Sequence, residues 1–436
     1  MMVAGRRKYA ALLSDPVMRQ LLASDALAFF GVWMTSLVVL TSVYATTHSS
    51  LAQGIVVASQ FGPALLVMPF AGHLLDRFNP VFFLIACRAI CGAITLLLFV
   101  VGSSMPVAVV LGLNVIFSTV FGLSVMATGV LLPLTMAEKN LVRGNIILRI
   151  VPNAMMMAGG LFLVADGAAF GLYGELLLAT LAFLASAVLL VPASVYCSDT
   201  RVIAKERSGV TRSFLDSFGY LIRERTLLKR FLVRMGVFVC SGGVIVMAII
   251  AETEFGHVIN AVGLFFAARG LGMIAGSLGI LPFLNSGRKS ENMALVAGLC
   301  IFGVAFAVAA WSVQFGLTVA AIFFAIAYAG EGIAKPVSLT LIQRGIEPAH
   351  LGRVMAMEQG LSAFVQASLT MLIAVILIEP SSQGVMVIAI ALATLVLLVA
   401  LATLFVGRDR ENRPIAVPTP SGGRLSKKEA DHALSQ

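Results

Sequence analysis

About twelve long apolar stretches run along this chain, and they limit its fold more than any motif does. They lie near 21–45, 51–75, 80–101, 106–136, 146–166, 173–195, 231–252, 258–284, 293–313, 316–341, 354–378 and 383–406. Each is close to the roughly 20 residues that an α-helix needs to cross the hydrocarbon core of a bilayer. Backbone groups in lipid must be hydrogen-bonded within their own segment, so each stretch is predicted to be a transmembrane helix.

The composition agrees with a membrane protein. Only 12% of the 436 residues are charged and 59% are hydrophobic, whereas a soluble domain has about 25% charged residues. One soluble core could not cover so much apolar surface, but lipid can surround it. The net charge of +9 would suggest a nucleic-acid partner in a soluble protein. Here the position of the charges matters more, and no nucleic-acid partner is expected.

The basic residues fall on one side of the predicted helices. If the N-terminus is inside, the outward connections lie near 46–50, 102–105, 166–174, 253–257, 314–315 and 379–382. None of these six connections contains a Lys or Arg. This asymmetry follows the positive-inside rule and predicts an inner-membrane protein with both termini in the cytoplasm. The first apolar stretch lacks a small-residue cleavage site, so we expect it to remain as helix 1.

A polar segment divides the chain into two six-helix halves. We predict a cytoplasmic N-terminus over 1–20, bundles over 21–195 and 231–406, a basic linker over 196–230 and a disordered tail over 407–436. The linker carries eight basic residues, which can bind anionic lipid headgroups. Two six-helix halves are typical of secondary transporters, whose substrate site lies between the halves. A small-molecule substrate, the lipid bilayer and a monomeric state are therefore expected.

Three motifs carry a resemblance to a known family. They are Gly-His-Leu-Leu-Asp-Arg at 72–77, Leu-Ile-Gln-Arg at 341–344 with Pro348 and Gly-Arg-Val at 352–354, and the helix 1 segment 15–33 that ends in Phe-Gly-Val-Trp. Together with the helix plan, they resemble the major facilitator superfamily over about residues 15–406. More narrowly, the chain is similar to the drug and siderophore efflux branch, which includes macrolide efflux pumps and the enterobactin exporter.

The resemblance implies a latch between the halves. Asp76, within the Gly72/Asp76/Arg77 motif, would lie at the N-terminus of helix 11 near Gly352 and Arg353. A carboxylate there is stabilised by the helix dipole and free N–H groups. The contact would hold the halves together when the cytoplasmic side is closed. The alternative is that the motif serves topology only, because Arg77 also fits the positive-inside pattern.

The sequence departs from the family pattern at three places. Asn-Pro-Val at 79–81 replaces the basic residues that usually follow Asp-Arg. Gly-Val-Trp at 31–33 replaces Gly-Asp-Trp, and Ala-Gly-Gly at 158–160 lacks the proline common in exporters. The direction of transport therefore stays open at this stage.

Six charged residues lie four or more positions inside the predicted helices, where charges cost a few kcal/mol or more and often mark function. They are Asp25, Arg88, Arg269, Glu331, Lys335 and Glu358. Asp25 and Glu358 are near the predicted cytoplasmic boundary, so capping or snorkelling would also explain them. Arg88 is expected to pair with a neighbouring carboxylate. Arg269 keeps its proton and needs an anionic partner or a substrate group.

Glu331 and Lys335 are the strongest candidates for proton coupling. Their i, i+4 spacing predicts an ion pair on one face of helix 10. In the resembled fold, helices 1, 4, 7 and 10 line the central cavity, which would place the pair on the substrate path. Burial disfavours the charged carboxylate and Lys335 favours it, so the pair could switch with protonation. The alternative is an ion pair that only stabilises the helix.

Other patterns are better explained by packing. Met155, Met156 and Met157 point in three directions on a helix. Cys87 and Cys91 fit apolar packing better than metal binding, and Gly270, Gly272, Gly276 and Gly279 permit close helix contacts. No nucleotide loop, zinc motif or nucleophile elbow is present, so no metal, cofactor, ATP coupling or enzymatic activity is expected.

The function predicted from the sequence is proton-coupled efflux of a small organic molecule. Glu331 is the first proton carrier considered and Asp25 the second. An importer or a lipid or metal-chelate permease of the same fold remains an alternative. A membrane scaffold that transports nothing is also possible, and a membrane enzyme is the least favoured reading.

Overall fold

The structure, a computed structural model, describes residues 16–61, 79–101, 106–135, 138–166, 171–192, 219–255, 259–280, 288–343, 346, 351–379 and 381–408. All regular structure in these ranges is helical. The first half contains α2 (Pro16–Thr47), α3 (Ser50–Ser59), α5 (Pro80–Val101), α6 (Val107–Thr135), α7 (Glu138–Asp166) and α8 (Gly171–Leu189). The second contains α11 (Arg225–Val237), η2 (Phe238–Gly242), α12 (Gly243–Phe255), α13 (Ile259–Gly279), α14 (Arg288–Ser312), η3 (Val313–Phe315), α15 (Leu317–Gln343), α16 (Leu351–Ile376) and α17 (Ser382–Arg408).

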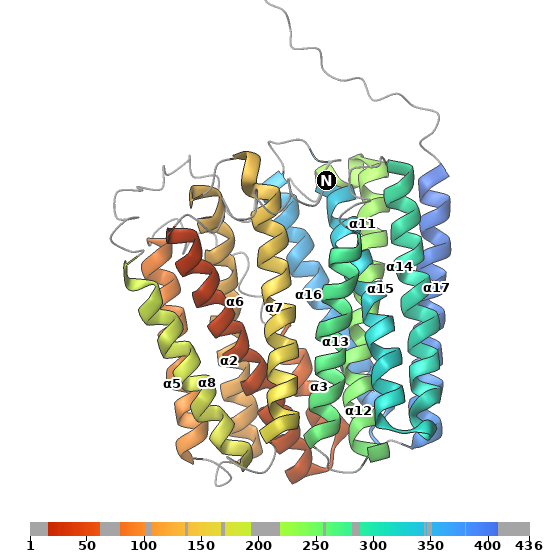
Figure 1. Cartoon of the computed structure of the whole chain (residues 1–436). Helices are drawn as coiled ribbons and strands as arrows, with labels where there is room; N and C mark the ends of the chain where they lie inside the picture. The colour runs from red at the N-terminus through yellow and green to blue at the C-terminus, as the bar shows by residue number, and fades with distance from the viewer. Residues whose placement is uncertain are drawn as a thin grey trace, which may run out of the picture.

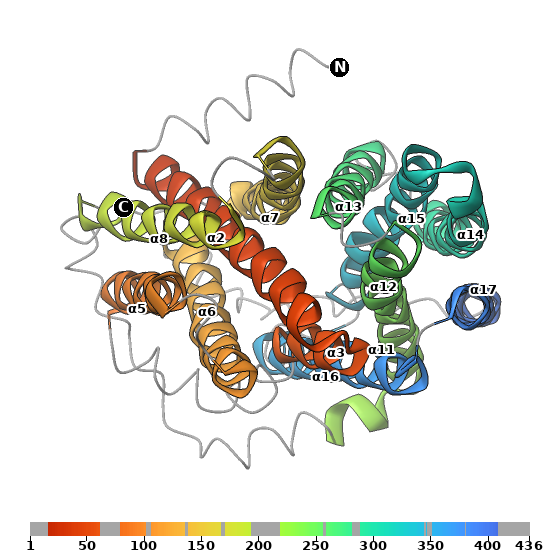
Figure 2. The ribbon, with the colours of Figure 1, turned by 90° about the horizontal axis from the view of Figure 1, so that it is seen from below.

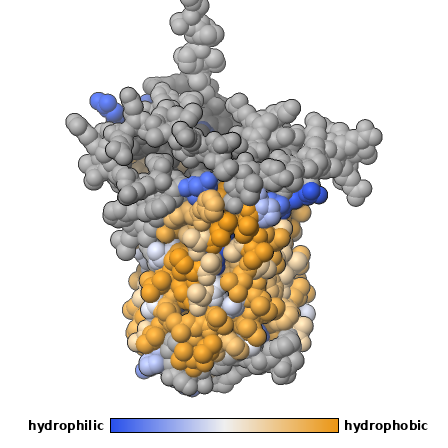
Figure 3. All heavy atoms as spheres, turned by 90° about the vertical axis from the view of Figure 1, so that its left-hand side faces the viewer, coloured by the Kyte–Doolittle hydropathy of each residue, from blue (hydrophilic) through white to orange (hydrophobic). Residues whose placement is uncertain are grey.

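The described helices have the length and composition of membrane spans. Nine of them are long and apolar enough to cross a bilayer, and three shorter apolar helices fall in the second, fifth and sixth predicted spans. Figure 3 shows apolar side chains over most of one face of the bundle, with hydrophilic ones near its upper boundary. The prediction of an all-α polytopic membrane protein is confirmed. That all twelve helices cross the membrane stays a prediction.

The helices run between two faces of the bundle. The start of α2 and the end of α17 lie at the upper face in Figure 1, and the turn from α2 to α3 lies at the lower face. The short η3 connection between α14 and α15 is also at the lower face. Both of these lower connections are free of Lys and Arg. The lower face is therefore the one that the charge pattern predicts to lie outside the cell.

The two halves meet through two helix pairs. Figure 2 shows α7 beside α13 and α3 beside α16, and each pair joins the N-terminal bundle to the C-terminal one. At the first junction, Gly160 in α7 lies against the backbone of Gly263 and Ala267 in α13. At the second, Gly54 lies against Ala374. Small residues at these positions let the helix backbones approach closely, as is common in membranes.

Helix α13 uses two faces of small residues. Gly270 lies against the α7 backbone at Asn153 and Met157, two turns after the Gly263 contact. Gly272 and Gly276 lie against the backbone of α15. The predicted close packing is thus confirmed for Gly270, Gly272 and Gly276. It is wrong for Gly279, because a Cβ added there would meet nothing within 4 Å.

Three apolar clusters form the core of the described residues. A large cluster contains residues of both halves, from Leu37 in α2 to Phe324 in α15. Two smaller clusters belong to one half each and lie where helices begin or end at the upper face. One includes Met18 and Leu84, and the other Phe231 and Met357. Within the described residues, the halves therefore share one large apolar cluster, and each half also has a small cluster of its own at the upper face.

Candidate functional site

A break in the helix formed by α11 and α12 begins the candidate site. The five residues of η2 form a 3-10 segment between the two α-helices. Such a segment inside a helix often marks a hinge or a functional position. Two glycines follow Ser241, and Gly242 packs against Leu369 in α16 while Gly243 packs against the ring of Phe306. The break turns the hydroxyl of Ser241 toward α15.

Ser241 joins an ion pair on α15. Lys335 Nζ lies 2.6 Å from Glu331 Oε1, which confirms the pairing predicted from their spacing. The Ser241 hydroxyl donates to Glu331 Oε1 over 2.8 Å and accepts from Lys335 Nζ over 3.0 Å. Glu331 is fully buried, and its second oxygen, Oε2, has no hydrogen-bond partner in the described part of the chain. One carboxylate oxygen is thus held by the network while the other remains open.

Pro336 interrupts the hydrogen bonds of α15 beside this pair. Proline has no backbone N–H, so the carbonyl four residues earlier loses its partner in the helix. That carbonyl belongs to Gly332, and it accepts from the hydroxyl of Ser277 in α13 over 3.1 Å. The main-chain oxygen of Lys335 accepts from Arg234 Nη1 of α11 over 2.5 Å. Side chains of two neighbouring helices therefore hydrogen-bond to the backbone of α15 at Gly332 and Lys335, while α15 itself continues from Leu317 to Gln343.

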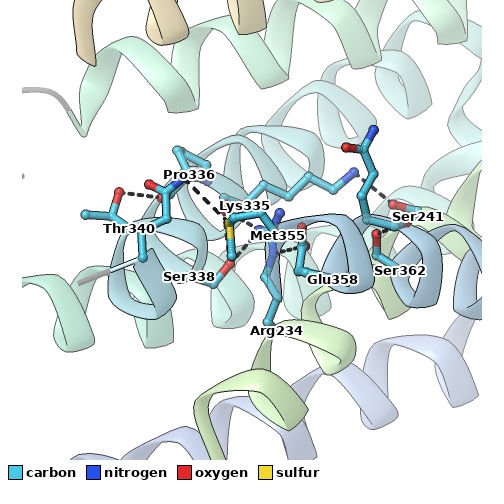
Figure 4. Close-up of polar contacts among 11 residues, drawn as sticks. Arg234, Ser241, Lys335, Pro336, Ser338, Thr340, Met355, Glu358 and Ser362 are labelled. Carbon is cyan, nitrogen blue, oxygen red and sulfur yellow. Dashed lines mark hydrogen bonds and ion pairs between the residues drawn. The ribbon is translucent and has the colours of Figure 1, made fainter. Parts of the chain in front are cut away.

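A second ion pair lies beside the first. Arg234 Nε is 2.7 Å from Glu358 Oε1 of α16, and both side chains are buried. Arg234 Nη1 also donates to the hydroxyl of Ser338 over 2.8 Å. Figure 4 shows Arg234 and Glu358 meeting close to Lys335 and Ser241. Arg234, Lys335 and the hinge at η2 thus form one polar region between α11, α15 and α16.

The ring of Phe238 adds a contact to both cations. The guanidinium carbon of Arg234 is 4.7 Å from the ring centroid, and Lys335 Nζ is 5.1 Å from it. A cation over an aromatic face is stabilised by the ring quadrupole. Phe238 begins η2, so the 3-10 segment supplies both an aromatic and a hydroxyl contact to the network. A shift of η2 would therefore disturb both ion pairs together.

Arg269 of α13 is buried without a carboxylate in hydrogen-bonding contact among the described residues. Its Nη1 donates to the Met156 sulfur of α7 over 3.0 Å. Its guanidinium carbon lies 5.9 Å from the Trp33 ring and 5.1 Å from the Tyr328 ring. The Nε atom has no hydrogen-bond partner in the described part. Met156 packs in the core, as expected from the sequence, and also serves as an acceptor for Arg269.

The N-terminal half contains a separate ion pair. Arg88 Nη2 in α5 is 2.5 Å from Asp25 Oδ1 in α2, and both residues are buried. The Thr128 hydroxyl of α6 also donates to Asp25 Oδ1, over 3.3 Å, and Arg88 lies 5.5 Å from the Phe121 ring. The expectation that Arg88 pairs with a neighbouring carboxylate is confirmed. Asp25 is buried and held by side chains of two neighbouring helices, Arg88 of α5 and Thr128 of α6, which favours a structural role over exposure at a boundary.

The structure thus brings together some of the predicted site residues and separates others. Glu331, Lys335 and Glu358 belong to one region. Arg269 lies beside Tyr328 of α15, close enough for its charge to act on Glu331. Asp25 belongs instead to the other half. Arg234 and Ser241 are missed from the sequence. Arg234 lies only three residues inside the predicted span 231–252, next to the basic linker, and a lone serine gives no signal. The helix-breaking Gly242–Gly243 pair was the available sign of the η2 hinge.

The predicted latch cannot be located. Gly72, Asp76 and Arg77 lie outside the described residues. Gly352 and Arg353 lie in the first turn of α16, where only the backbone is described. That turn is a helix N-terminus at the upper face, as the prediction requires. The contact with Asp76 stays a prediction.

The chain is similar to solved transporter structures. No family model and no curated protein sequence matches it. The nucleoside transporter NupG is 16% identical, with 90% of this chain and 99% of that one covered and a TM-score of 0.63. A POT family transporter in complex with a thioalcohol conjugated peptide is 14% identical, with coverage of 88% and 95% and a TM-score of 0.68.

A third structure gives the same result. A bacterial homologue of the iron transporter ferroportin, in the inward-facing state, is 15% identical, with coverage of 90% and 98% and a TM-score of 0.64. Identities this low show the fold alone. The matches show that the chain shares the all-α fold of these transporter structures, which confirms the predicted fold class.

Proposed function

We propose that this protein is a secondary active transporter that exports a small organic molecule from the cell in exchange for protons. The main support is the second carboxylate oxygen of Glu331, Oε2. Oε2 is buried and without a hydrogen-bond partner in the described part, while Oε1 is held by Lys335 and Ser241. A carboxylate in this position can take up one proton without first losing its other contacts.

The arrangement of the halves supports alternating access. The halves pack closely through Gly160 of α7 against α13 and Gly54 of α3 against α16, toward the lower ends of these helices. If the lower face is outside, this state is closed to the outside. Transporters of this type expose a central site to one side and then the other by rocking the two bundles. The glycine contacts between α7 and α13 provide a surface on which the bundles can separate.

Protonation of Glu331 would change the hinge region. A neutral Glu331 no longer attracts Lys335, so the shared contact through Ser241 is weakened. Because Ser241 lies in η2, the change reaches the break between α11 and α12 directly. Because Lys335 precedes Pro336, it also reaches the point in α15 where a backbone hydrogen bond is missing. One proton can thus alter the η2 hinge and the proline site of α15 together.

The test is flux under an imposed pH gradient. Inside-out vesicles with the protein are incubated with a cell extract, and accumulated compounds are identified by mass spectrometry. We expect gradient-driven accumulation with the native protein. Glu331→Gln should abolish the response to the gradient and leave downhill exchange of the same compound measurable. Glu254→Gln, which changes an exposed carboxylate of α12, is the matched control and should behave like the native protein.

Each other outcome has a defined meaning. An unchanged gradient response in Glu331→Gln would remove it as the proton carrier and leave Asp25 as the next candidate. Uptake in the opposite direction would make the protein an importer. No flux of any compound would favour the scaffold. If Glu331→Gln fails to reach the membrane, the variant that also carries Lys335→Gln removes both charges and avoids an unpaired buried lysine.

A further inference from the structure

Among the described residues, the charges around the hinge do not balance. Three buried or partly buried cations in this part of the chain, Arg234, Arg269 and Lys335, face two carboxylates, Glu331 and Glu358. The two ion pairs neutralise Arg234 and Lys335. The positive charge of Arg269 remains, and only 6% of this residue is exposed. A buried charge without a counter-ion is costly, so an arginine kept in this state indicates a missing anion.

The present partners of Arg269 stabilise a cation without neutralising it. The Met156 sulfur is a weak acceptor, the Trp33 and Tyr328 rings offer their faces, and the Tyr328 hydroxyl, which also interacts with Arg269, is neutral. Glu331 acts on Arg269 through space but is already paired with Lys335. Lys335 in turn adds to the positive field of the region. No carboxylate lies within ion-pairing distance of Arg269 among the described residues.

The free edge of the guanidinium group is suited to an oxyanion. Rings lie near the group, while Nε is buried and has no hydrogen-bond partner in the described part. Tyr328 Oη has no hydrogen-bond partner there either. The planar fork of arginine binds two oxygens of a carboxylate or phosphate in parallel. Nε and Tyr328 Oη could therefore both donate to such a group.

The position of Arg269 links an anion to the movement of the halves. Arg269 and Tyr328 belong to the C-terminal half, whereas Met156 and Trp33 belong to the N-terminal half. Gly270, the next residue, lies against the α7 backbone. An anion that replaces the Met156 sulfur would therefore weaken a contact between the halves at the point where they meet most closely.

We propose that Arg269 binds the anionic group of the transported molecule, so that the substrates are organic anions with a carboxylate or phosphate group. This inference rests on the proposed function, because it assigns the substrate class of the same transporter. Binding of the anion neutralises the charge of Arg269 and displaces its contact with Met156. The loaded protein then differs from the empty one in the contact between α7 and α13.

The test measures anion binding through Trp33. The chain has two tryptophans, and Trp311→Phe removes the exposed one, so Trp33 becomes the single reporter beside Arg269. The purified protein is titrated with the anionic quencher iodide, and caesium and acrylamide serve as cationic and neutral quenchers. Hexanoate and hexanamide are then added as competitors that have similar shape and differ in charge.

The expected result is specific to the positive charge. Arg269→Gln should lower quenching by iodide by about tenfold, the loss expected for one charged hydrogen-bonding partner. Quenching by caesium and acrylamide should not change. Hexanoate should protect Trp33 from iodide, and hexanamide should not. Met156→Leu, which keeps the side-chain volume, should increase iodide quenching because it removes the competing acceptor.

Several results would overturn the inference. Equal iodide quenching in the native protein and Arg269→Gln would exclude an anion site at Arg269, and so would equal protection by hexanoate and hexanamide. If Arg269→Gln does not fold, two other variants still test whether Arg269 binds an anion. Arg269→Lys should weaken the protection by hexanoate, and Met156→Leu should strengthen it. Anion binding without proton-driven flux would refute the proposed function alone, whereas flux without anion binding would refute this inference alone.

Discussion

Replacing Gly160 by alanine should open the lower face of the bundle. A Cβ at this position would lie 2.7 Å from the Ala267 nitrogen and still closer to the Gly263 oxygen. Both are backbone atoms of α13, so no change of side-chain rotamer can relieve the clash. Helices α7 and α13 must therefore move apart, and the state in which they are packed loses stability relative to the open one.

The size of the effect follows from the cost of overpacking. An extra methyl group in a packed interface costs about 1–3 kcal/mol. Alanine also favours the helix over glycine by about 1 kcal/mol, but this gain is the same in both states and does not change their ratio. The population open at the lower face should therefore rise by about five- to 150-fold.

Cysteine labelling measures this opening. Gln53 of α3 is fully buried, on the helix that packs against α16. In a protein whose five native cysteines are replaced by serine, Gln53→Cys reports the open state through its rate of reaction with an impermeant maleimide. Gly279→Ala is the matched control, because a Cβ there meets nothing within 4 Å. An unchanged rate in Gly160→Ala, or an equal rise in both variants, would refute the reasoning.

Two further predictions concern stability and topology. Arg234→Gln or Glu358→Gln alone should cost about 3–5 kcal/mol, because each leaves a buried charge unpaired, and the double variant should lose much less than the sum. Thermal unfolding in detergent measures this, and additive losses would contradict a coupled pair. Cysteines at the exposed positions Thr46 and Ser382 should react with an impermeant reagent from outside the cell, and one at Glu224 should not. Labelling of Glu224→Cys from outside would reverse the topology.

Local patterns in the sequence predict the helices well. Hydropathy and the positions of basic residues depend on the lipid environment of each segment, so they can be read without knowing the packing. The Glu331–Lys335 pair is predictable for a similar reason, since residues four apart on a helix are neighbours in any fold. The start of α11 is harder to place. Its first turns carry Arg225 and Arg230, which lower the hydropathy, and the predicted span begins only at 231.

Contacts between helices are less predictable. Arg88 and Asp25 are 63 residues apart, and Arg234 and Glu358 are 124 apart. Whether such residues meet depends on the rotation and tilt of each helix, which spacing along one helix does not determine. The sequence therefore shows that Arg88 needs a carboxylate but not which one. It gives no sign that the partner of Arg269 is a thioether.

The polar contacts of α15 also bear on how the chain enters the membrane during synthesis. A lysine at the centre of a single inserting helix opposes insertion by about 2.5–3.5 kcal/mol, and α15 adds a glutamate and a proline. Ser241 hydrogen-bonds the side chains of this lysine and glutamate, and Ser277 hydrogen-bonds the carbonyl that the proline leaves without a partner. Both serines lie on segments made earlier, so they are available when α15 leaves the ribosome. Arg234 is in the opposite position, because its partner Glu358 is made only later, in α16. The C-terminal half thus cannot complete its polar core until α16, the eleventh predicted helix of the chain, is synthesised, and a chain truncated before α16 should be recognised as unfinished by membrane proteases.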